Sequence, residues 1–188
     1  MNANENLVKK QKKEDEEFEI EEEKIKKEKI IKSNLGIAHT RWATHGKPSK
    51  ENSHPHMDNS KTFSVVHNGI IENYNELRDF LTKNGYTFYS QTDTEIVPNL
   101  IHYYYNKTEG NDITKLLKSV QTACLDLKGS FAIEVISSLY SDNMIVVRQD
   151  SPLVIGTRED EKYLSDCATE LFAKCVCGRQ VDIKLLKL

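Results

Sequence analysis

The sequence predicts an α+β fold in which helices and antiparallel strands occur in blocks. Apolar residues recur at helical spacing in residues 74–84 and 113–127. Residues 131–136 and 144–147 are short apolar runs that follow one another, which is typical of an antiparallel hairpin. The elements do not alternate strand and helix as a doubly wound parallel sheet requires. A length of 188 residues suits one domain, with or without a tail.

The first part of that domain is expected to begin with a strand at residues 35–42 and a polar loop extending to Lys61. Residues 63–67 then form a buried strand, and Asn68-Gly69 is a strong turn signal. The helix predicted over residues 74–84 carries Leu77, Phe80 and Leu81 on one face. Gly85 follows it and is suited to a left-handed helix end.

The central part is predicted to contain a short strand and two helices. The strand covers residues 86–89. Thr92-Asp93-Thr94-Glu95 has the hydroxyl and carboxylate oxygens of a helix start. The helix that follows extends to about Tyr105, with Pro98 in its first turn or at a kink. Residues 113–127 form the second helix, closed by Lys128-Gly129.

The C-terminal part is dominated by strands. After the hairpin formed by residues 131–136 and 144–147, weaker strands are expected at residues 153–155 and 163–164. Residues 169–177 form a candidate final helix, and the pattern beyond it predicts no particular element.

Charge and composition divide the chain into three regions. Lys and Glu dominate residues 1–34, and the apolar residues there are too sparse for a sustained heptad pattern. We therefore expect a disordered arm or a lone charged helix. A coiled-coil partner site is the alternative. Residues 35–166 have ordinary globular composition. Residues 167–188 are a tail of unknown role.

The composition also excludes several classes of function. The net charge of −3 provides no basic field for nucleic acid or an anionic membrane. No apolar run approaches the roughly 18 residues of a membrane helix, and the first twenty residues lack the apolar core of a signal peptide. We therefore expect a cytoplasmic protein without nucleic-acid or membrane partners.

Cysteines and histidines are the candidate metal ligands. The cysteines stand at positions 124, 167, 175 and 177, in no common zinc spacing, and without a secretory signal they do not imply disulfides. Five of the six histidines lie between positions 39 and 67. A small metal-binding protein built on these histidines is one alternative, although no carboxylate or cysteine recurs at a matching spacing beside them. We expect no metal and no cofactor.

Four polar segments carry the candidate chemistry. They are Thr40-Arg41-Trp42-Ala43-Thr44-His45-Gly46, Asn52-Ser53-His54-Pro55-His56, His67-Asn68-Gly69-Ile70-Ile71-Glu72-Asn73-Tyr74 and Thr92-Asp93-Thr94-Glu95. Taken singly, each has a structural explanation. Asn68-Gly69 is most often a turn, and Asp93 is most often a helix cap.

Together and in this order, the four segments resemble class II glutamine amidotransferases, in the form found in glutamine–fructose-6-phosphate aminotransferases. Weaker similarity continues to Ser165-Asp166, so the resemblance covers about residues 35–166. It implies an N-terminal-nucleophile (Ntn) hydrolase-like four-layer αββα sandwich. It also implies L-glutamine as substrate, whose hydrolysis supplies ammonia for glucosamine 6-phosphate synthesis.

The resemblance assigns roles that agree with the chemistry of glutamine. Arg41 would bind the α-carboxylate, for which a bidentate cation is suited, and Asp93 the α-ammonium group. Asn68 and Gly69 would form the oxyanion hole, one with its side chain and the other with its backbone N–H. The pocket lining would comprise Trp42, Thr44 and His45, with His54 on a flap loop.

The chain departs from the family pattern at its start. The family opens with a short Cys-Gly-Ile strand and a helix, and its cysteine supplies both nucleophile and α-amine. Here the chain begins Met1-Asn2-Ala3, and the isomerase half that would be a partner domain or chain is also missing. We therefore expect an incomplete sandwich that lacks activity by itself, so the sequence leaves open whether the chain is an enzyme. The alternative is a non-catalytic glutamine-binding or protein-interaction module.

Overall fold

The computed structural model describes residues 35–39, 47, 49–158, 161–165 and 182–187, with side chains described up to Leu153. The predicted arm at residues 1–34, the motif residues 40–46 and the candidate helix at 169–177 lie outside this part. The chain divides into two units, residues 1–33 and 34–188, and the fold below is that of the second unit.

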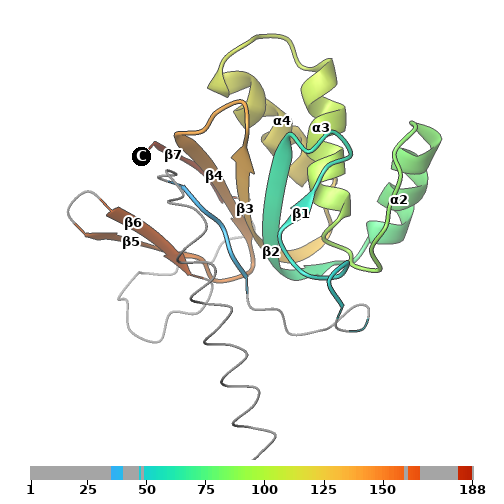
Figure 1. Cartoon of the computed structure of the whole chain (residues 1–188), viewed down its shortest axis with the longest axis horizontal. Coiled ribbons are helices and arrows are strands. Elements are labelled where there is room, and N and C mark those ends of the chain that lie inside the picture. The colour runs from blue at the N-terminus through green and yellow to red at the C-terminus, as the bar shows by residue number, and fades with distance from the viewer. Residues whose placement is uncertain (1–34, 40–46, 48, 159–160, 166–181, 188) are drawn as a thin grey trace, which may run out of the picture. The chain divides into compact units, whose positions relative to one another are not determined.

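A five-stranded antiparallel sheet forms the centre of the domain. Its order is β1 (His56–Met57), β2 (Phe63–Ile71), β3 (Gly129–Ser137), β4 (Asn143–Gln149) and β7 (Asp182–Lys187) (Figure 1). Adjacent strands pair antiparallel throughout. β5 (Val154–Arg158) and β6 (Glu161–Ser165) form a separate two-stranded sheet. The predicted α+β class, the β3–β4 hairpin and the two weaker strands are thus confirmed.

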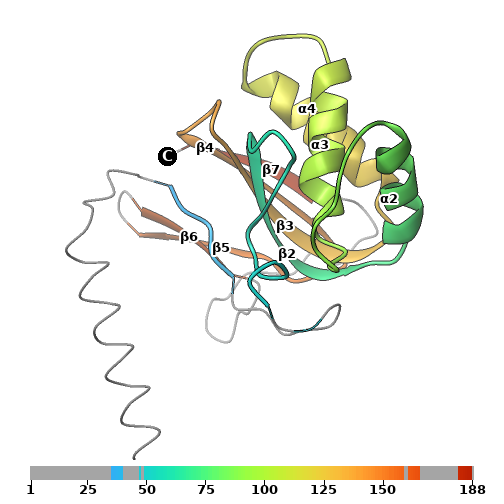
Figure 2. The same ribbon diagram turned by 45° about the vertical axis from the view of Figure 1, so that its right-hand side comes forward.

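Three helices lie on one face of the five-stranded sheet: α2 (Tyr74–Lys83), α3 (Ile96–Lys107) and α4 (Ile113–Asp126) (Figure 2). Gly85 takes a positive φ of 89° directly after α2, and the Tyr86 N–H donates to the Leu81 carbonyl 3.1 Å away, as the predicted left-handed helix end requires. Asp112 caps α4 by accepting from the Thr114 N–H at 3.0 Å. The helices predicted from apolar spacing are all present.

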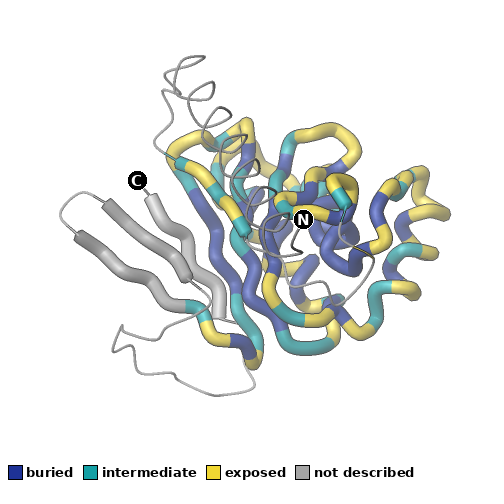
Figure 3. Tube along the Cα trace, turned by 60° about the horizontal axis from the view of Figure 1, so that its bottom comes forward, coloured by how far each residue is buried: buried dark blue, intermediate teal, exposed yellow. Residues whose placement is uncertain are grey.

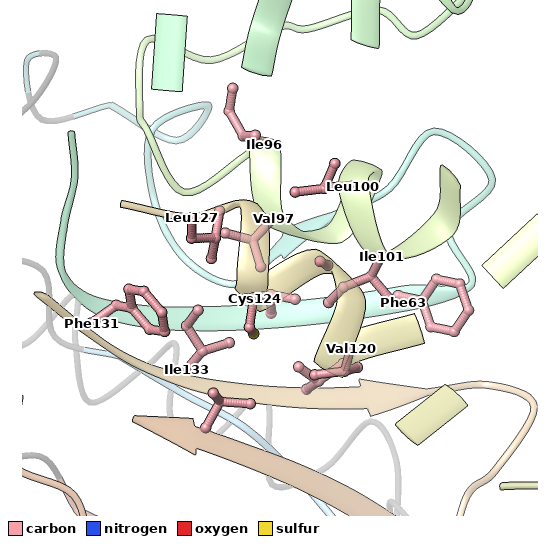
Figure 4. Close-up of a cluster of buried hydrophobic side chains, with 14 of the residues drawn as sticks. Phe63, Ile96, Val97, Leu100, Ile101, Val120, Cys124, Leu127, Phe131 and Ile133 are labelled. Carbon is pink, nitrogen blue, oxygen red and sulfur yellow. The ribbon is translucent and has the colours of Figure 1, made fainter. Parts of the chain in front are cut away.

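The hydrophobic core lies between these helices and the sheet. Alternate residues of β2, β3 and β4 face it, as the two-residue period of a strand dictates. Figure 4 shows the contributions of the helices and strands, among them Phe63, Ile101, Val120, Cys124 and Ile133. Burial of this apolar face, at about 25 cal/mol per Å², is the main force holding helices and sheet together.

The opposite face of the sheet is unevenly covered. Val66 and Val146 on this face are also buried, at 4% and 2% exposure, whereas Ile70 is 46% exposed and Asn68 is exposed. Figure 3 shows buried residues along the central strands, and exposed residues both in the connections and on the helices.

Two local predictions are wrong. Asn68-Gly69 is not a turn, because β2 continues to Ile71 and pairs with β3 over nine residues. Residues 86–89 are not a strand, because the N–H groups of Thr87 and Tyr89 donate to side chains, at 2.8 Å to Asn59 Oδ1 and 3.0 Å to Glu95 Oε1.

The sequence also misplaced or missed three further features. Residues 35–39, the described part of the strand expected at 35–42, are not in a strand, and the predicted polar loop contains β1. Glu95 occupies the N-cap of α3 without a side-chain cap bond, so the cap interpretation of residues 92–95 is wrong. β7 lies in the tail and pairs with β4, although no strand was predicted there.

Candidate functional site

The outer edge of β2 brings three of the four polar segments together. His56 in β1 pairs with Val65 near the start of this edge. His54 precedes His56 by two residues and lies beside His67, nearer the end of β2. Its Nδ1 accepts from the His67 backbone N–H at 3.4 Å. An accepting Nδ1 has no proton, so Nε2 of His54 carries the ring hydrogen.

Asp93 binds the same edge near the end of the strand. Its Oδ2 accepts from the Ile71 N–H at 2.9 Å, and the side chain is only 4% exposed. Successive N–H groups of a strand alternate between its two edges. Gly69 lies midway between His67 and Ile71 in the sequence, so its backbone is placed between the imidazole and the carboxylate.

Gly69 is the residue that the close strand pairing requires. Its φ is 131°, and a Cβ at this position would meet the Ser130 carbonyl oxygen at 2.1 Å. Its neighbour Asn68 pairs with Ala132 across the sheet and is exposed. The two residues predicted to form an oxyanion hole are thus adjacent on an accessible strand rather than in a turn.

Histidine rings connect the polar segments. His54 stacks on His39, with ring centroids 4.6 Å apart and planes inclined by 24°. His54 also packs edge-on against His56, with ring centroids 5.1 Å apart and planes inclined by 65°. His39 directly precedes the first polar segment, whose predicted ligands Arg41, Trp42, Thr44 and His45 lie outside the described residues.

The segment Thr92-Asp93-Thr94-Glu95 is buried and supplies the second half of the site. Thr92 Oγ1 is 3.0 Å from His56 Nε2, and Thr94 Oγ1 is 2.9 Å from His67 Nδ1. Glu95 is fully buried, and its carboxylate accepts from Tyr89 N at 3.0 Å and from Ser90 N at 2.7 Å. The two hydroxyls bind histidines, and the two carboxylates hold backbone N–H groups.

Several of these residues were not predicted as parts of the site. His67 and Glu95 belong to segments that the sequence singled out, but their partners are set by contacts between distant residues. Asn52 is a similar case. Its side-chain Nδ2 donates to the Lys47 carbonyl and its Oδ1 accepts from the Gln91 N–H, both at 2.9 Å. The concentration of histidines between positions 39 and 67 was the available signal for the ring cluster.

The described residues contain no group of three or more His, Cys, Asp or Glu side chains arranged to hold a metal ion. Within the same residues, none of the helices is both long and apolar enough to cross a membrane. Cys124 is 1% exposed in the core, and burial raises the pKa of its thiol to about 12. It therefore does not act as a nucleophile at neutral pH, where a thiolate is needed.

Solved structures give the class of protein to which this fold corresponds. The chain resembles the glutamine phosphoribosylpyrophosphate amidotransferase from B. subtilis complexed with ADP and GMP, with a TM-score of 0.52 and 28% identity over 67% of this chain and 26% of that one. A structure described as the allosteric regulatory enzyme of purine biosynthesis matches with the same TM-score and coverage at 25% identity. The fold is thus that of an α+β amidotransferase domain.

Sequence comparison gives the family. The profile of the glutamine amidotransferase domain matches residues 39–171, so the chain belongs to this family and the predicted resemblance is confirmed. The glutamine–fructose-6-phosphate aminotransferase (isomerizing) of Clostridium tetani is 50% identical over 166 residues, or 88% of this chain and 25% of the relative. That of Clostridium perfringens is 50% identical over 138 residues, 73% and 22% respectively. The chain spans about a quarter of the length of these relatives.

Proposed function

We propose that this chain is the glutamine-binding part of a cytoplasmic glutaminase domain. In the longer proteins it resembles, the domain would release ammonia from L-glutamine for conversion of fructose 6-phosphate to glucosamine 6-phosphate in the hexosamine pathway. Membership of the glutamine amidotransferase family and the names of relatives at 50% identity support this assignment. A sugar-phosphate isomerase domain or chain would be its partner.

The observation that carries the proposal is the edge of β2 between His54 and Asp93. Hydrolysis of an amide builds negative charge on the carbonyl oxygen, and a backbone N–H aimed at that oxygen stabilises it. Gly69 lies between His67, whose N–H donates to His54, and Ile71, whose N–H donates to the Asp93 carboxylate at 2.9 Å, and Asn68 is exposed beside it. The Gly69 N–H would serve as the oxyanion donor, and Asp93, bound at the same edge of β2, as the anion for the α-ammonium group.

The remaining roles complete a glutamine site. Arg41 would bind the α-carboxylate, and Trp42, Thr44 and His45 would line the pocket that begins after His39. His54, with its ring hydrogen on Nε2, would close over the ligand as part of the flap loop. The Cys124 thiol is buried, so we propose that the attacking cysteine is not Cys124.

The four-layer αββα sandwich is part of the same proposal. Val66, Ala132, Met144 and Val146 make the central part of the second face of the sheet apolar and buried. An antiparallel sheet with two apolar faces needs cover on both. The helices cover one face, and a second sheet that includes β5 and β6 would cover the other.

Asp93→Asn tests the site without removing its structural hydrogen bond. The amide oxygen of asparagine still accepts from the Ile71 N–H, but the negative charge for the ligand ammonium is gone. One charge-assisted contact contributes about 1.5–3 kcal/mol, so the affinity for L-glutamine should fall about 10–150-fold. Calorimetric titration with L-glutamine measures it, and thermal melting should change little.

Two controls separate charge from folding. Asp58 is another buried carboxylate, and it accepts from Thr62 N at 2.8 Å and Phe63 N at 2.6 Å in a turn. Asp58→Asn should lower stability without a specific effect on glutamine. 4-Carbamoylbutanoate, which lacks the α-ammonium group, should bind wild type and Asp93→Asn equally. Equal glutamine affinity in wild type and Asp93→Asn would refute the proposed site.

A further inference from the structure

A continuous chain of buried hydrogen bonds leads from Glu95 to the histidine cluster. Ser90 Oγ donates to Glu95 Oε2 at 2.6 Å, lies 2.9 Å from Thr92 Oγ1, and Thr92 Oγ1 lies 3.0 Å from His56 Nε2. All four side chains are at most 3% exposed. The two hydroxyls therefore link a buried carboxylate to a buried imidazole.

The carboxylate at one end sets the direction of every bond in this chain. Ser90 Oγ donates to Glu95 Oε2, and a hydroxyl has a single hydrogen to donate. Ser90 gives its hydrogen to Glu95, so it accepts from Thr92. Thr92 in turn accepts from His56, whose Nε2 must carry a hydrogen. The distant Glu95 thereby selects the tautomer of His56.

The other half of the same segment selects the opposite tautomer in a neighbouring ring. Thr94 Oγ1 donates to Asp93 Oδ1 over a long 3.5 Å contact, and it lies 2.9 Å from His67 Nδ1. With its hydrogen given to Asp93, Thr94 would accept from His67, which would place the ring hydrogen of His67 on Nδ1. One tetrad, residues 92–95, thus orients two histidines on two strands in different ways.

His54 contacts the His56 ring and the His67 backbone. The His56 ring packs edge-on against the His54 ring at 5.1 Å, and the His67 N–H donates to His54 Nδ1. A buried ring that is held through its Nε2 cannot flip without breaking its bond to Thr92. The orientation of His56 is therefore passed to His54 by packing.

We infer that Glu95, Ser90 and Thr92 are positioning residues for the glutamine site, because their hydrogen-bond chain holds His56 as the Nε2–H tautomer and so fixes His54 at the Gly69 edge. This inference rests on the proposed function for its effect on glutamine. The arrangement of the rings is tested independently of any ligand.

The experiment uses the 188-residue protein with ¹⁵N-labelled histidine and records long-range ¹H–¹⁵N spectra of the imidazoles. Wild type should show His56 as Nε2–H and His67 as Nδ1–H. Thr92→Val removes the hydroxyl at nearly constant shape, so the share of the Nε2–H form of His56 should fall and the His54 signals should move. Thr92→Ser restores the hydroxyl and should restore the wild-type spectrum. Thr94→Val, a buried control in the same segment, should alter His67 and leave the tautomer of His56 unchanged.

Titration with L-glutamine provides the functional reading. Thr92→Val should bind glutamine about three- to tenfold more weakly, the loss expected from one hydrogen bond, and Thr92→Ser should bind as wild type does. If Thr92→Val does not fold, Ser90→Ala interrupts the chain one link further from the ring.

The outcomes distinguish the two claims. A wild-type His56 in the Nδ1–H form, or His54 and His56 signals unchanged in Thr92→Val, overturns the inference. Equal glutamine affinity in wild type and Thr92→Val overturns it too. If wild type fails to bind glutamine, the proposed function fails, and the imidazole spectra still decide how the rings are held.

Discussion

Replacing Gly69 by alanine should unfold the sheet from its centre. The Cβ would lie 2.1 Å from the Ser130 carbonyl oxygen and 2.9 Å from the Phe131 Cα, both backbone atoms of β3. Ordinary contacts of carbon atoms are about 3.5–4.0 Å. The strands must therefore separate by more than about 1 Å, and that movement breaks the pairing that holds β2 in the core.

The magnitude follows from separating two effects. A non-glycine residue at positive φ costs roughly 1–2 kcal/mol. The backbone overlap adds to this cost, so we expect Gly69→Ala to lower the free energy of unfolding by more than about 4 kcal/mol, in the range that marks severe substitutions. Domains are stable by only about 5–15 kcal/mol, so much of the protein should lose its fold.

Gly85→Ala is the matched control, because Gly85 has a φ of 89° but no neighbouring atom within 4 Å of the added Cβ. It should cost only the roughly 1–2 kcal/mol of backbone strain. Urea unfolding followed by far-UV circular dichroism compares the two variants. Gly129→Ala, whose Cβ would meet the Ile70 carbonyl oxygen at 2.2 Å, should resemble Gly69→Ala. Equal losses in Gly69→Ala and Gly85→Ala would refute the reasoning.

Three further predictions concern other parts of the chain. Burial raises the pKa of the Cys124 thiol from 9.0 to about 12. The stability that the protonated thiol contributes is therefore complete below pH 9 and is lost as the pH rises to about 12, by up to about 1.4 kcal/mol per pH unit. Urea unfolding at several pH values should show a steeper loss of stability with pH in wild type than in Cys124→Ala. Glu95→Gln places an amide NH₂ against backbone N–H donors and should cost about 1.5–3 kcal/mol in thermal or urea unfolding, whereas an unchanged melting temperature would contradict the described contacts. Deleting residues 1–33, a separate unit with few apolar side chains, should leave the melting temperature of the rest unchanged, and a clear drop would show that this segment packs on the domain.

The sequence by itself determined the elements whose signal is local. Apolar spacing located α2 and α4, the composition of residues 92–95 indicated the start of α3, and the end of α2 at Gly85 followed from the conformational freedom of glycine. The apolar runs of β3 and β4 were sufficient to identify their hairpin. The order of four polar segments was sufficient to indicate the family, and the match of the glutamine amidotransferase profile confirms it.

Only the tertiary structure decided where the polar groups find their partners. Asn68-Gly69 has a turn propensity, but nine paired residues of β2 and β3 outweigh it, and the same glycine is needed for close strand approach. Asp93 and Glu95 have the composition of a helix cap, yet they accept N–H groups from Ile71 and from Tyr89 and Ser90. Hydrogen-bond partners far apart in the chain are chosen by how strands and loops pack, and a local sequence pattern does not contain that information.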